Sequence, residues 1–375
     1  MGLVVRAEYM AAQHGRFAGG AASVQFPFEL LANQIFVPVT VNGKGPYTFI
    51  LDTGAPGVVI ASESANALGV TNDDMTFGFA KNFAATAAVG TFPLALSQPL
   101  VARTIHGIIG LDILHRYVWR VDYAKRMITV YDPDRFVYTG SGAVLPFAGM
   151  YGAYDPQVDG QLVVRGRDPI PVRFTLDLGA GGTVISAPLV AQYDLLQSVG
   201  RTLPEFGVVG TTPDVGLEAR VAALRIGPYT LEQPIVLLTQ DKDGPFASKS
   251  IGVNLGGSIL RRFTVTIDYS RQRLIFEPNR SFGQPFQADA TGIAFMAAGS
   301  DFKTFTIRDV APNSPGTEIG LQKGDVITAL DGRPAANYAA WQLQDVFKES
   351  GRRIALTIRR GNAIFVKTIA LRRLL

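Results

Sequence analysis

The sequence predicts a mainly β protein in which one lobe occurs twice and a smaller α/β domain follows. Two similar motifs around an aspartate, a second pair of similar segments downstream, and a change of pattern near residue 280 predict this arrangement. The length of 375 residues exceeds what one core usually organises. We expect a first lobe over residues 26–140, a second lobe over 141–282 and a C-terminal domain over 285–375.

The first pair of similar segments is FILDTGAPGVVI (49–60) and FTLDLGAGGTVI (174–185). Each follows two alternating apolar runs joined by a glycine-containing turn, the pattern of a β-hairpin. The second pair, at 108–131 and 254–277, shares a glycine, an Ile-Leu pair and an Asp-Tyr hairpin turn. Because these features recur in the same order, duplication explains them better than chance. The second copy is longer between its motifs, which predicts an insertion roughly within residues 197–250.

The composition is that of a well-packed globular protein. Hydrophobic residues make up 47% of the chain, with 40 Gly and 22 Pro, which excludes disorder. The 35 basic and 31 acidic residues are spread along the chain, so we expect no nucleic-acid partner. There is no cysteine, which excludes disulfides, thiol catalysis and cysteine-ligated zinc. No apolar run reaches the roughly 18 residues of a membrane-spanning helix, so we expect no membrane span.

Asp52 and Asp177 occupy the same place in the two copies. A single aspartate beside glycine usually shapes a turn by accepting backbone hydrogen bonds. Here each acid follows a segment that reads as a buried strand, where a carboxylate without partners is costly. Duplicated lobes pack most simply about a pseudo-twofold axis, at which equivalent residues meet. Two carboxylates that meet share one proton, and such a pair can activate a water for attack on an amide without a metal or cofactor.

ILDTGA (50–55) together with Ile108-Ile109-Gly110 resembles the retropepsin group of aspartic proteases. TLDLGA (175–180) with Asn254-Leu255-Gly256 resembles a second lobe of the same kind. The resemblance covers roughly residues 30–280 and implies two retropepsin-like lobes related by pseudo-twofold symmetry, here fused in one chain. It implies that Asp52 and Asp177 are the catalytic pair. Their supporting loop positions are Thr53, Gly54, Ala55, Leu178, Gly179 and Ala180.

In this family each lobe also supplies a flap over the cleft. By position, the first flap would be TFGFAKNFA (76–84), with Phe77, Gly78 and Phe79 as its candidate residues. The second would be EFGVVGTTPDVG (205–216), whose glycines suit a mobile hairpin tip. Its candidate residues are Gly207, Val208, Val209 and Gly210. Surface hairpins with no role as a lid are the alternative for both segments.

One loop position departs from the family pattern. The residue after the acid is normally Thr or Ser, whose hydroxyl braces the two loops across the axis. Thr53 fits this pattern, whereas Leu178 has no hydroxyl to give. The departure favours an alternative function, in which the chain is a catalytically inactive peptide-binding or scaffold protein that retains the protease fold.

The C-terminal segment SPGTEIGLQKGDVITALDGRP (314–334) resembles the PDZ domains found in bacterial proteases. GIAF, residues Gly292, Ile293, Ala294 and Phe295, resembles the loop that receives a peptide's terminal carboxylate in these domains. The helix lining the groove would lie within residues 338–350. The resemblance implies C-terminal peptides as partners. A tethered peptide-binding module can raise the local substrate concentration, and regulation or the binding of another protein is the alternative role.

The sequence contains no motif for another catalytic chemistry. His14, His106 and His115 stand in no metal-ligand spacing, so we expect no metal site. GAGG (179–182) lacks the spacing of a dinucleotide-binding loop. We therefore expect an aspartic endopeptidase that acts on polypeptides as a single chain, needs no cofactor and, if bacterial, works in the periplasm or outside the cell.

Overall fold

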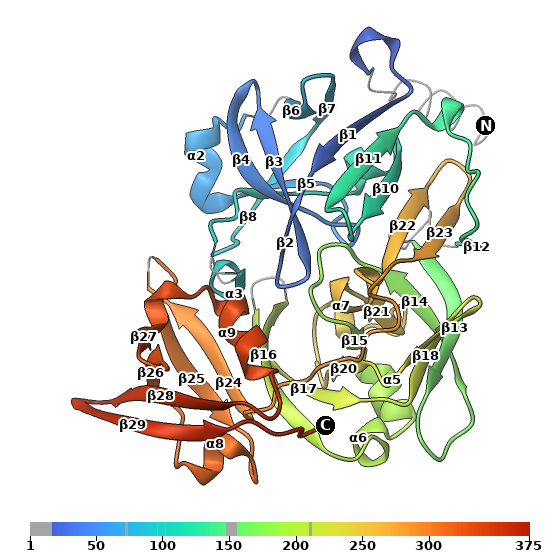
Figure 1. Cartoon of the computed structure of the whole chain (residues 1–375). Coiled ribbons are helices and arrows are strands. Elements are labelled where there is room, and N and C mark those ends of the chain that lie inside the picture. Colours follow the sequence, from blue (N-terminus) through green and yellow to red (C-terminus); the bar gives the residue numbers. More distant parts are fainter. Residues whose placement is uncertain are drawn as a thin grey trace.

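The computed structural model describes residues 17–71, 74–95, 97–101, 103–147, 156–209, 212–299 and 301–375. Strands hold 44% of the chain and helices 15%, which confirms the mainly β prediction. Figure 1 shows two stacked β lobes and a C-terminal domain beside the second. Within the described residues, no helix is long and apolar enough to cross a membrane.

The first lobe is built on an eight-stranded sheet with the order β7-β6-β3-β4-β9-β5-β8, to which β2 adds by pairing with β3. Its strands are β2 Glu29–Leu31, β3 Gln34–Val41, β4 Lys44–Leu51, β5 Val58–Ala61, β6 Met75–Ala80, β7 Phe83–Ala87, β8 Val89–Phe92 and β9 Gly107–Ile109. Its short helices are α2 Ala65–Leu68, α3 Gln98–Val101 and α4 Leu111–Leu114. We call these elements the first lobe.

The second lobe is a nine-stranded sheet with the order β16-β17-β20-β15-β21-β14-β13-β18-β19. Its strands are β13 Gln157–Val163, β14 Ile170–Leu176, β15 Val184–Ile185, β16 Thr202–Val209, β17 Thr212–Arg220, β18 Ala223–Ile226, β19 Tyr229–Glu232, β20 Ile235–Leu238 and β21 Val253–Leu255. Its helices are α5 Ala187–Gln192, α6 Leu195–Ser198 and α7 Gly257–Leu260.

The two sheets repeat one another strand by strand. Read from the opposite end, the second sheet runs β19-β18-β13-β14-β21-β15-β20, which matches the seven-strand path of the first. The pairing directions match too, because β4–β9 and β14–β21 are both parallel, and so are β5–β8 and β15–β20. The hairpin β16–β17 is the extra part of the second copy, and it lies within the range where the sequence predicts an insertion.

A third sheet joins the lobes. Its order is β1-β11-β10-β22-β23-β12, and β10 pairs with β22 so that Val121 lies opposite Val265. Its strands are β1 Ser23–Pro27, β10 Val118–Asp122, β11 Met127–Tyr131, β12 Ala143–Pro146, β22 Phe263–Asp268 and β23 Arg273–Pro278. Asp122 and Asp268 end β10 and β22 and accept backbone hydrogen bonds within the following turns, at 3.0 and 3.2 Å. They shape hairpin turns, as the sequence predicts.

The C-terminal domain has a core of its own. Its sheet has the order β24-β25-β26-β28-β29, with β27 paired to β26. Phe305, Leu343 and Leu356 are fully buried in its hydrophobic cluster. The elements are β24 Ile293–Ala298, β25 Thr304–Val310, α8 Pro315–Glu318, β26 Val326–Leu330, β27 Arg333–Pro334, α9 Ala340–Phe347, β28 Arg353–Arg360 and β29 Ala363–Ala370.

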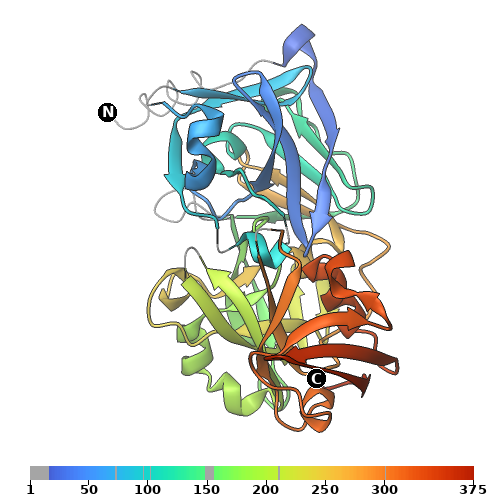
Figure 2. The ribbon, with the colours of Figure 1, turned by 90° about the vertical axis from the view of Figure 1, so that its left-hand side faces the viewer.

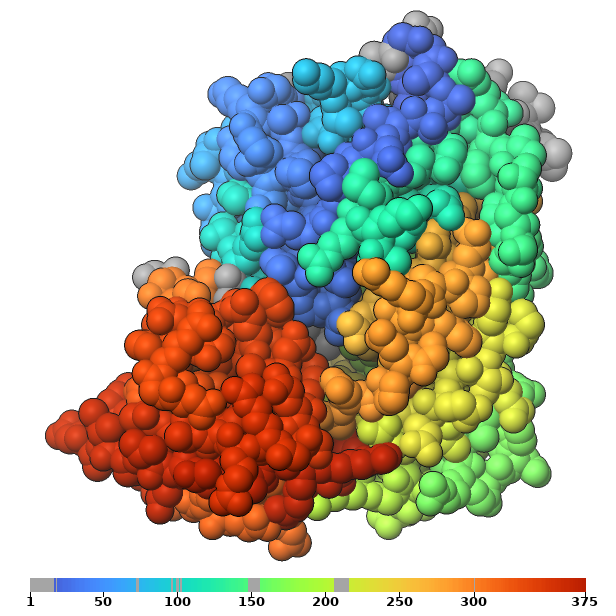
Figure 3. All heavy atoms as spheres, in the orientation of Figure 1, coloured from blue at the N-terminus to red at the C-terminus, as the bar shows by residue number. Residues whose placement is uncertain are grey.

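This domain is packed against both lobes (Figures 2 and 3). On the second lobe, Leu203 of β16 forms a small apolar cluster with Ala311 and Leu374. Arg201 donates hydrogen bonds to the carbonyls of residues 312 and 313, at 3.0 and 3.1 Å. On the first lobe, α3 lies against both α9 and β24 (Figure 1). The domain therefore touches the extra hairpin and the first lobe at the same time.

Half-buried charged groups lie where the hairpin meets this domain. Burial raises the pKa of Glu205 on β16 and of Glu218 on β17. The negative charge of Asp289 raises the pKa of both carboxyls further. Burial also raises the pKa of Asp289 to about 6. Lys348, just after α9, counteracts these shifts in all three carboxyls. Oε2 of Glu218 is buried and has no hydrogen-bond partner among the described residues.

We predict that this junction loses stability as the pH rises. Because burial raises the folded-state pKa of these acids, the folded protein retains protons that the unfolded chain has released, so the contribution is full below about pH 4.5 and is lost toward about pH 8. Glu218→Gln removes one of the charges. We expect it to raise the thermal unfolding midpoint at pH 8 by roughly 2–4 °C and to change the midpoint little at pH 5.

The matched control is Glu232→Gln on β19, because Glu232 is exposed. It should leave the midpoint unchanged at both pH values. Equal effects of Glu218→Gln at pH 5 and pH 8 would contradict this account of the junction.

Candidate active site

Asp52 and Asp177 stand at equivalent ends of buried strands. Asp52 follows β4, and its N–H donates to the carbonyl of Ile109 on the parallel neighbour β9, at 3.0 Å. Asp177 follows β14, and its N–H donates to the carbonyl of Leu255 on β21, also at 3.0 Å. Each carboxylate therefore leaves its sheet at a point fixed by the same parallel pair of strands.

The two carboxylates converge across the lobe boundary. A Cβ atom built on Gly54 would lie 3.2 Å from Oδ1 of Asp52 and 3.3 Å from Oδ2 of Asp177. One built on Gly179 would lie 2.2 Å from Cγ of Asp52. Each acid thus lies against the glycine of the opposite loop, and a side chain at Gly179 would occupy the same space as the Asp52 carboxyl group. Both acids are half-buried and Gly54 is exposed, so water can reach this point.

Backbone N–H groups of the loops donate hydrogen bonds to the acids. Gly54 donates to Oδ1 of Asp52 at 2.7 Å, and Gly179 donates to Oδ1 of Asp177 at 2.8 Å. Ala180 adds a second bond to the same oxygen of Asp177, at 3.0 Å. Ala55 is buried, and its carbonyl accepts from Leu111.

The glycines of the second motif pair allow close backbone packing behind each loop. A Cβ on Gly110 would lie 2.2 Å from the carbonyl oxygen of Gly57. A Cβ on Gly256 would lie 1.9 Å from that of Gly182. Neither position has room for a side chain, which explains why both copies carry glycine there.

A single hydroxyl braces the two loops. Oγ1 of Thr53 donates to the carbonyl of Leu176 at 2.6 Å and accepts from the N–H of Leu178 at 3.0 Å. Thr53 and Leu178 are both fully buried. The first lobe therefore holds the loop of the second, while Leu178 contributes apolar burial in place of the reciprocal hydroxyl.

Two residues that bind this loop were not among the predicted site residues. Asn254 on β21 donates through Nδ2 to Oδ2 of Asp177 at 2.7 Å. Gln34 on β3 reaches across from the first lobe and donates to the carbonyl of Gly179. Asn254 stands where the first lobe has the apolar Ile108, and a polar amide at this apolar position was the signal that could have identified it.

The structure contradicts the first predicted flap. Phe77 and Phe79 lie in β6, which pairs with β3 inside the sheet, and both side chains are buried in the lobe core. Gly78 pairs with Thr40 at the same place. In the order of the sheet, β6–β7 corresponds to β18–β19 of the second lobe, so this hairpin is part of the repeated sheet.

The second predicted flap falls on the extra hairpin. Gly207, Val208 and Val209 are the last three residues of β16. Gly210 lies outside the described residues. Among the described strands, the first lobe has no hairpin that corresponds to β16–β17. Whether this hairpin acts as a lid stays a prediction.

Gly292 of the GIAF segment immediately precedes β24, which begins at Ile293, and the loop before the strand is hydrogen-bonded internally. The N–H of Thr291 donates to Oδ2 of Asp289 at 3.0 Å, and that of Gly292 donates to the same oxygen. The N–H of Ile293 donates to Oγ1 of Thr291 at 3.0 Å. Ile293, Ala294 and Phe295 are buried.

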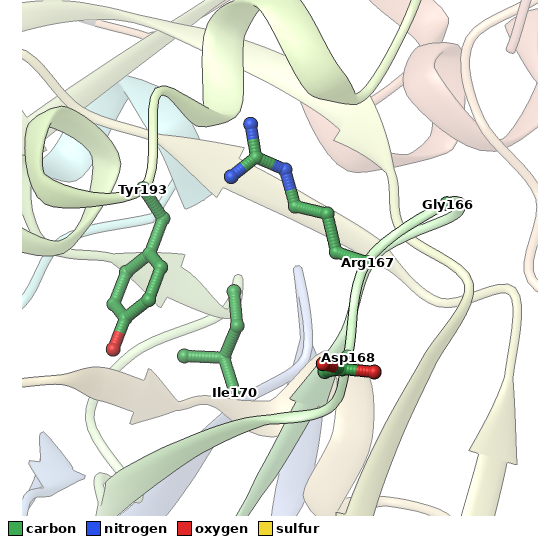
Figure 4. Close-up of a pocket in the computed structure, with 5 residues that line it drawn as sticks. All are labelled: Gly166, Arg167, Asp168, Ile170 and Tyr193. Carbon is green, nitrogen blue, oxygen red and sulfur yellow. The ribbon is translucent and has the colours of Figure 1, made fainter.

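Two cavities lie elsewhere. Figure 4 shows one in the second lobe, where Arg167, Ile170 and Tyr193 surround a common space. The other, of about 710 Å³, lies between the second lobe and the C-terminal domain and is lined by Arg220, Asp289 and Lys348 among others. Neither includes a residue of the two acid loops.

Residues 37–113 match the family model described as aspartyl protease, and residues 306–360 match that of the PDZ domain. The crystal structure of an aspartic proteinase from Irpex lacteus is similar with a TM-score of 0.46 and 14% identity. The match covers 70% of this chain and 99% of the proteinase chain. An HtrA3 PDZ domain bound to a phage-derived ligand (FGRWV) is similar with a TM-score of 0.20 and 29% identity, over 22% of this chain and 85% of its own.

Mouse serine protease HTRA3 is 39% identical over 70 residues, which is 18% of this chain and 15% of that protein. The chain therefore spans a small part of that relative's length. The family matches follow the division seen in the fold, since one lies in the first lobe and the other in the C-terminal domain. The chain thus matches the aspartyl protease family at residues 37–113 and the PDZ domain family at residues 306–360.

Proposed function

We propose that this chain is an aspartic endopeptidase in which Asp52 and Asp177 together activate a water. The observation that carries the proposal is the convergence of the two carboxylates, each against the glycine of the opposite loop. Equivalent positions of a duplicated fold meet here, and both acids are half-buried.

Two carboxylates at such close quarters share one proton, because both cannot ionise without strong mutual repulsion. The ionised member accepts a proton from water while the protonated member donates to the carbonyl oxygen of the peptide bond. Water oxygen bonds to the carbonyl carbon and a gem-diol forms. Proton transfer to the amide nitrogen then breaks the C–N bond, and no covalent enzyme intermediate is needed.

The extra hairpin is the feature that we propose covers the substrate. The flap candidates before its turn, Gly207, Val208 and Val209, belong to the strand β16 at the edge of the second sheet. Since the first lobe has no such hairpin among its described strands, we propose that an extended polypeptide is covered from the second lobe alone.

We propose that the PDZ domain regulates the protease by binding peptides. In PDZ domains a peptide adds to the strand after the carboxylate loop and packs against the helix. Here these are β24 and α9, and α3 of the first lobe lies against both. A peptide entering this groove would therefore compete with α3. The internal hydrogen bonds of the Asp289–Ile293 loop add to the cost of opening the site.

The second candidate function is a peptide-binding protein without catalysis, and Leu178 is the observation that favours it. A missing hydroxyl would weaken the catalytic geometry if it left the loops loose. Thr53 alone, however, binds both the carbonyl of Leu176 and the N–H of Leu178. Since one hydroxyl satisfies both backbone groups, the geometry favours the enzyme.

We predict that Asp52→Asn and Asp177→Asn each abolish peptide cleavage. Each change removes one of the two proton-transfer groups, so kcat/KM should fall by roughly 10²–10⁴-fold. Cleavage of a quenched fluorescent peptide library between pH 4 and 8 is the measurement.

Asp168→Asn is the matched control, since Asp168 is exposed in the loop between β13 and β14, in the same lobe as Asp177. It should cleave like the wild type. Undiminished cleavage by either dyad variant would remove the dyad from the mechanism. A wild type that binds C-terminal peptides but cuts none of the library would favour the non-catalytic function.

We predict that loosening α3 strengthens peptide binding at the PDZ domain. Gln98→Gly with Pro99→Gly leaves the buried Val101 in place but weakens the short helix. Because a competing occupant reduces apparent affinity by the fraction of open sites, we expect about tenfold tighter binding. Fluorescence anisotropy with labelled FGRWV, the ligand of the HtrA3 domain, is the measurement.

The C-terminally amidated peptide is the control for carboxylate recognition and should bind weakly to both proteins. An unchanged affinity in the variant, with an unchanged unfolding midpoint, would show that α3 does not occupy the groove.

A further inference from the structure

Asn254 places a side-chain donor beside one member of the acid pair. It lies in β21, where it is opposite Thr175 of β14 and Val184 of β15, so strands on both sides fix its backbone. Its side chain is buried, with 3% of the residue exposed. Nδ2 donates to Oδ2 of Asp177 at 2.7 Å, a short distance typical of a charge-assisted hydrogen bond.

The equivalent position in the first lobe is Ile108. It lies in β9 opposite Ile50 of β4 and Val59 of β5, which are the counterparts of β14 and β15. Isoleucine has no side-chain N–H group, so this position cannot donate to Asp52. The repeat is therefore broken at a position that faces the reacting carboxylates.

Asp177 is bound by three N–H groups. Gly179 and Ala180 donate to Oδ1 at 2.8 and 3.0 Å, and Asn254 donates to Oδ2 at 2.7 Å. The backbone N–H groups of Gly179 and Ala180 can only donate, so Oδ1 of Asp177 must accept both bonds. Hydrogen bonds given to a carboxylate favour its ionised form, and two or three of them have a strong effect.

Two titratable groups lie near Asp177 in the part of the chain that the structure describes. One is Asp52, which lies across the lobe boundary and competes for the same proton. The other is Tyr123, at the end of β10. Burial raises the pKa of the Tyr123 hydroxyl, and the charge of Asp177 raises it further, so this group stays neutral in the working range. Neither Asp52 nor Tyr123 is a cation that could share the role of Asn254.

We propose that Asn254 is a positioning residue that holds the negative charge of the acid pair on Asp177, so that Asp52 carries the shared proton. This assignment rests on the proposed peptidase function. Asp177 then takes a proton from the attacking water while Asp52 gives its proton to the carbonyl oxygen. On collapse of the gem-diol, Asp177 protonates the leaving nitrogen as the C–N bond breaks. One hydroxyl proton returns to Asp52, which restores the starting state.

The test is the pH dependence of the pair in Asn254→Leu, which gives this position an apolar side chain like that of Ile108. Loss of the donor makes the singly ionised pair harder to form. We expect the acid limb of the kcat/KM profile to move upward by about 1 pH unit, so that activity below the optimum falls about tenfold. Asn254→Thr retains a hydroxyl donor and should restore part of the shift.

A second readout does not depend on catalysis. In protein labelled with ¹³C at the aspartate carboxyls, the resonance lost in Asp177→Asn identifies Asp177. We expect its acid titration midpoint to rise by about 1 pH unit in Asn254→Leu. Ile108→Leu is the matched control in the first lobe and should move neither the pH profile nor this midpoint.

An Asn254→Leu protein with reduced stability but an unmoved profile and midpoint would overturn the proposal, because it would reduce Asn254 to a packing residue. If Asn254→Leu shifts the carboxyl midpoint but the wild-type protein cleaves no peptide, the peptidase function is refuted and the charge assignment stands.

Discussion

The contact between the two acid loops is the constraint on which the rest of the structure depends. The Thr53 hydroxyl joins the lobes by satisfying a buried carbonyl and a buried N–H group of the opposite loop. Each bond is worth only about 0.5–1.5 kcal/mol net, but leaving those groups unpaired in a buried place would cost more. The shared sheet through β10 and β22 holds the lobes at the distance that this contact needs. Without such registration, equivalent aspartates in two lobes would have no reason to meet.

Much of this arrangement could be predicted from the sequence. The acids and the glycines at 54, 110, 179 and 256 stand in short motifs whose spacing is local, and the duplication carries the same strand order into both sheets. The prediction of a flap at residues 76–84 is wrong for a physical reason. Alternating phenylalanines fit a surface hairpin and a core strand equally well, and the pairing of β6 with the distant β3 decides between them. The contact of Asn254 also depends on a nonlocal pairing, that of β21 with β14.

The lobes have diverged in complementary ways. The first lobe supplies Thr53 and Gln34, which reach across to hold the loop around Asp177. The second lobe carries the extra hairpin, and the C-terminal domain packs against the base of that hairpin. Here the first lobe stays close to the minimal sheet, while the second gathers the additional contacts.

The position of the C-terminal domain sets a thermodynamic condition on any regulation. If a peptide displaces α3 from the groove between β24 and α9 and thereby changes the affinity of the acid site for substrate, then substrate must change the affinity for that peptide by the same factor. The domain contacts both the first lobe and the hairpin β16–β17, so the coupling would pass through packed elements. Protonation of the half-buried carboxyls of Glu205 and Glu218 would stabilise this packing. Acidic conditions would therefore strengthen the contact between the C-terminal domain and the hairpin β16–β17, which is one of the two contacts through which such coupling would pass.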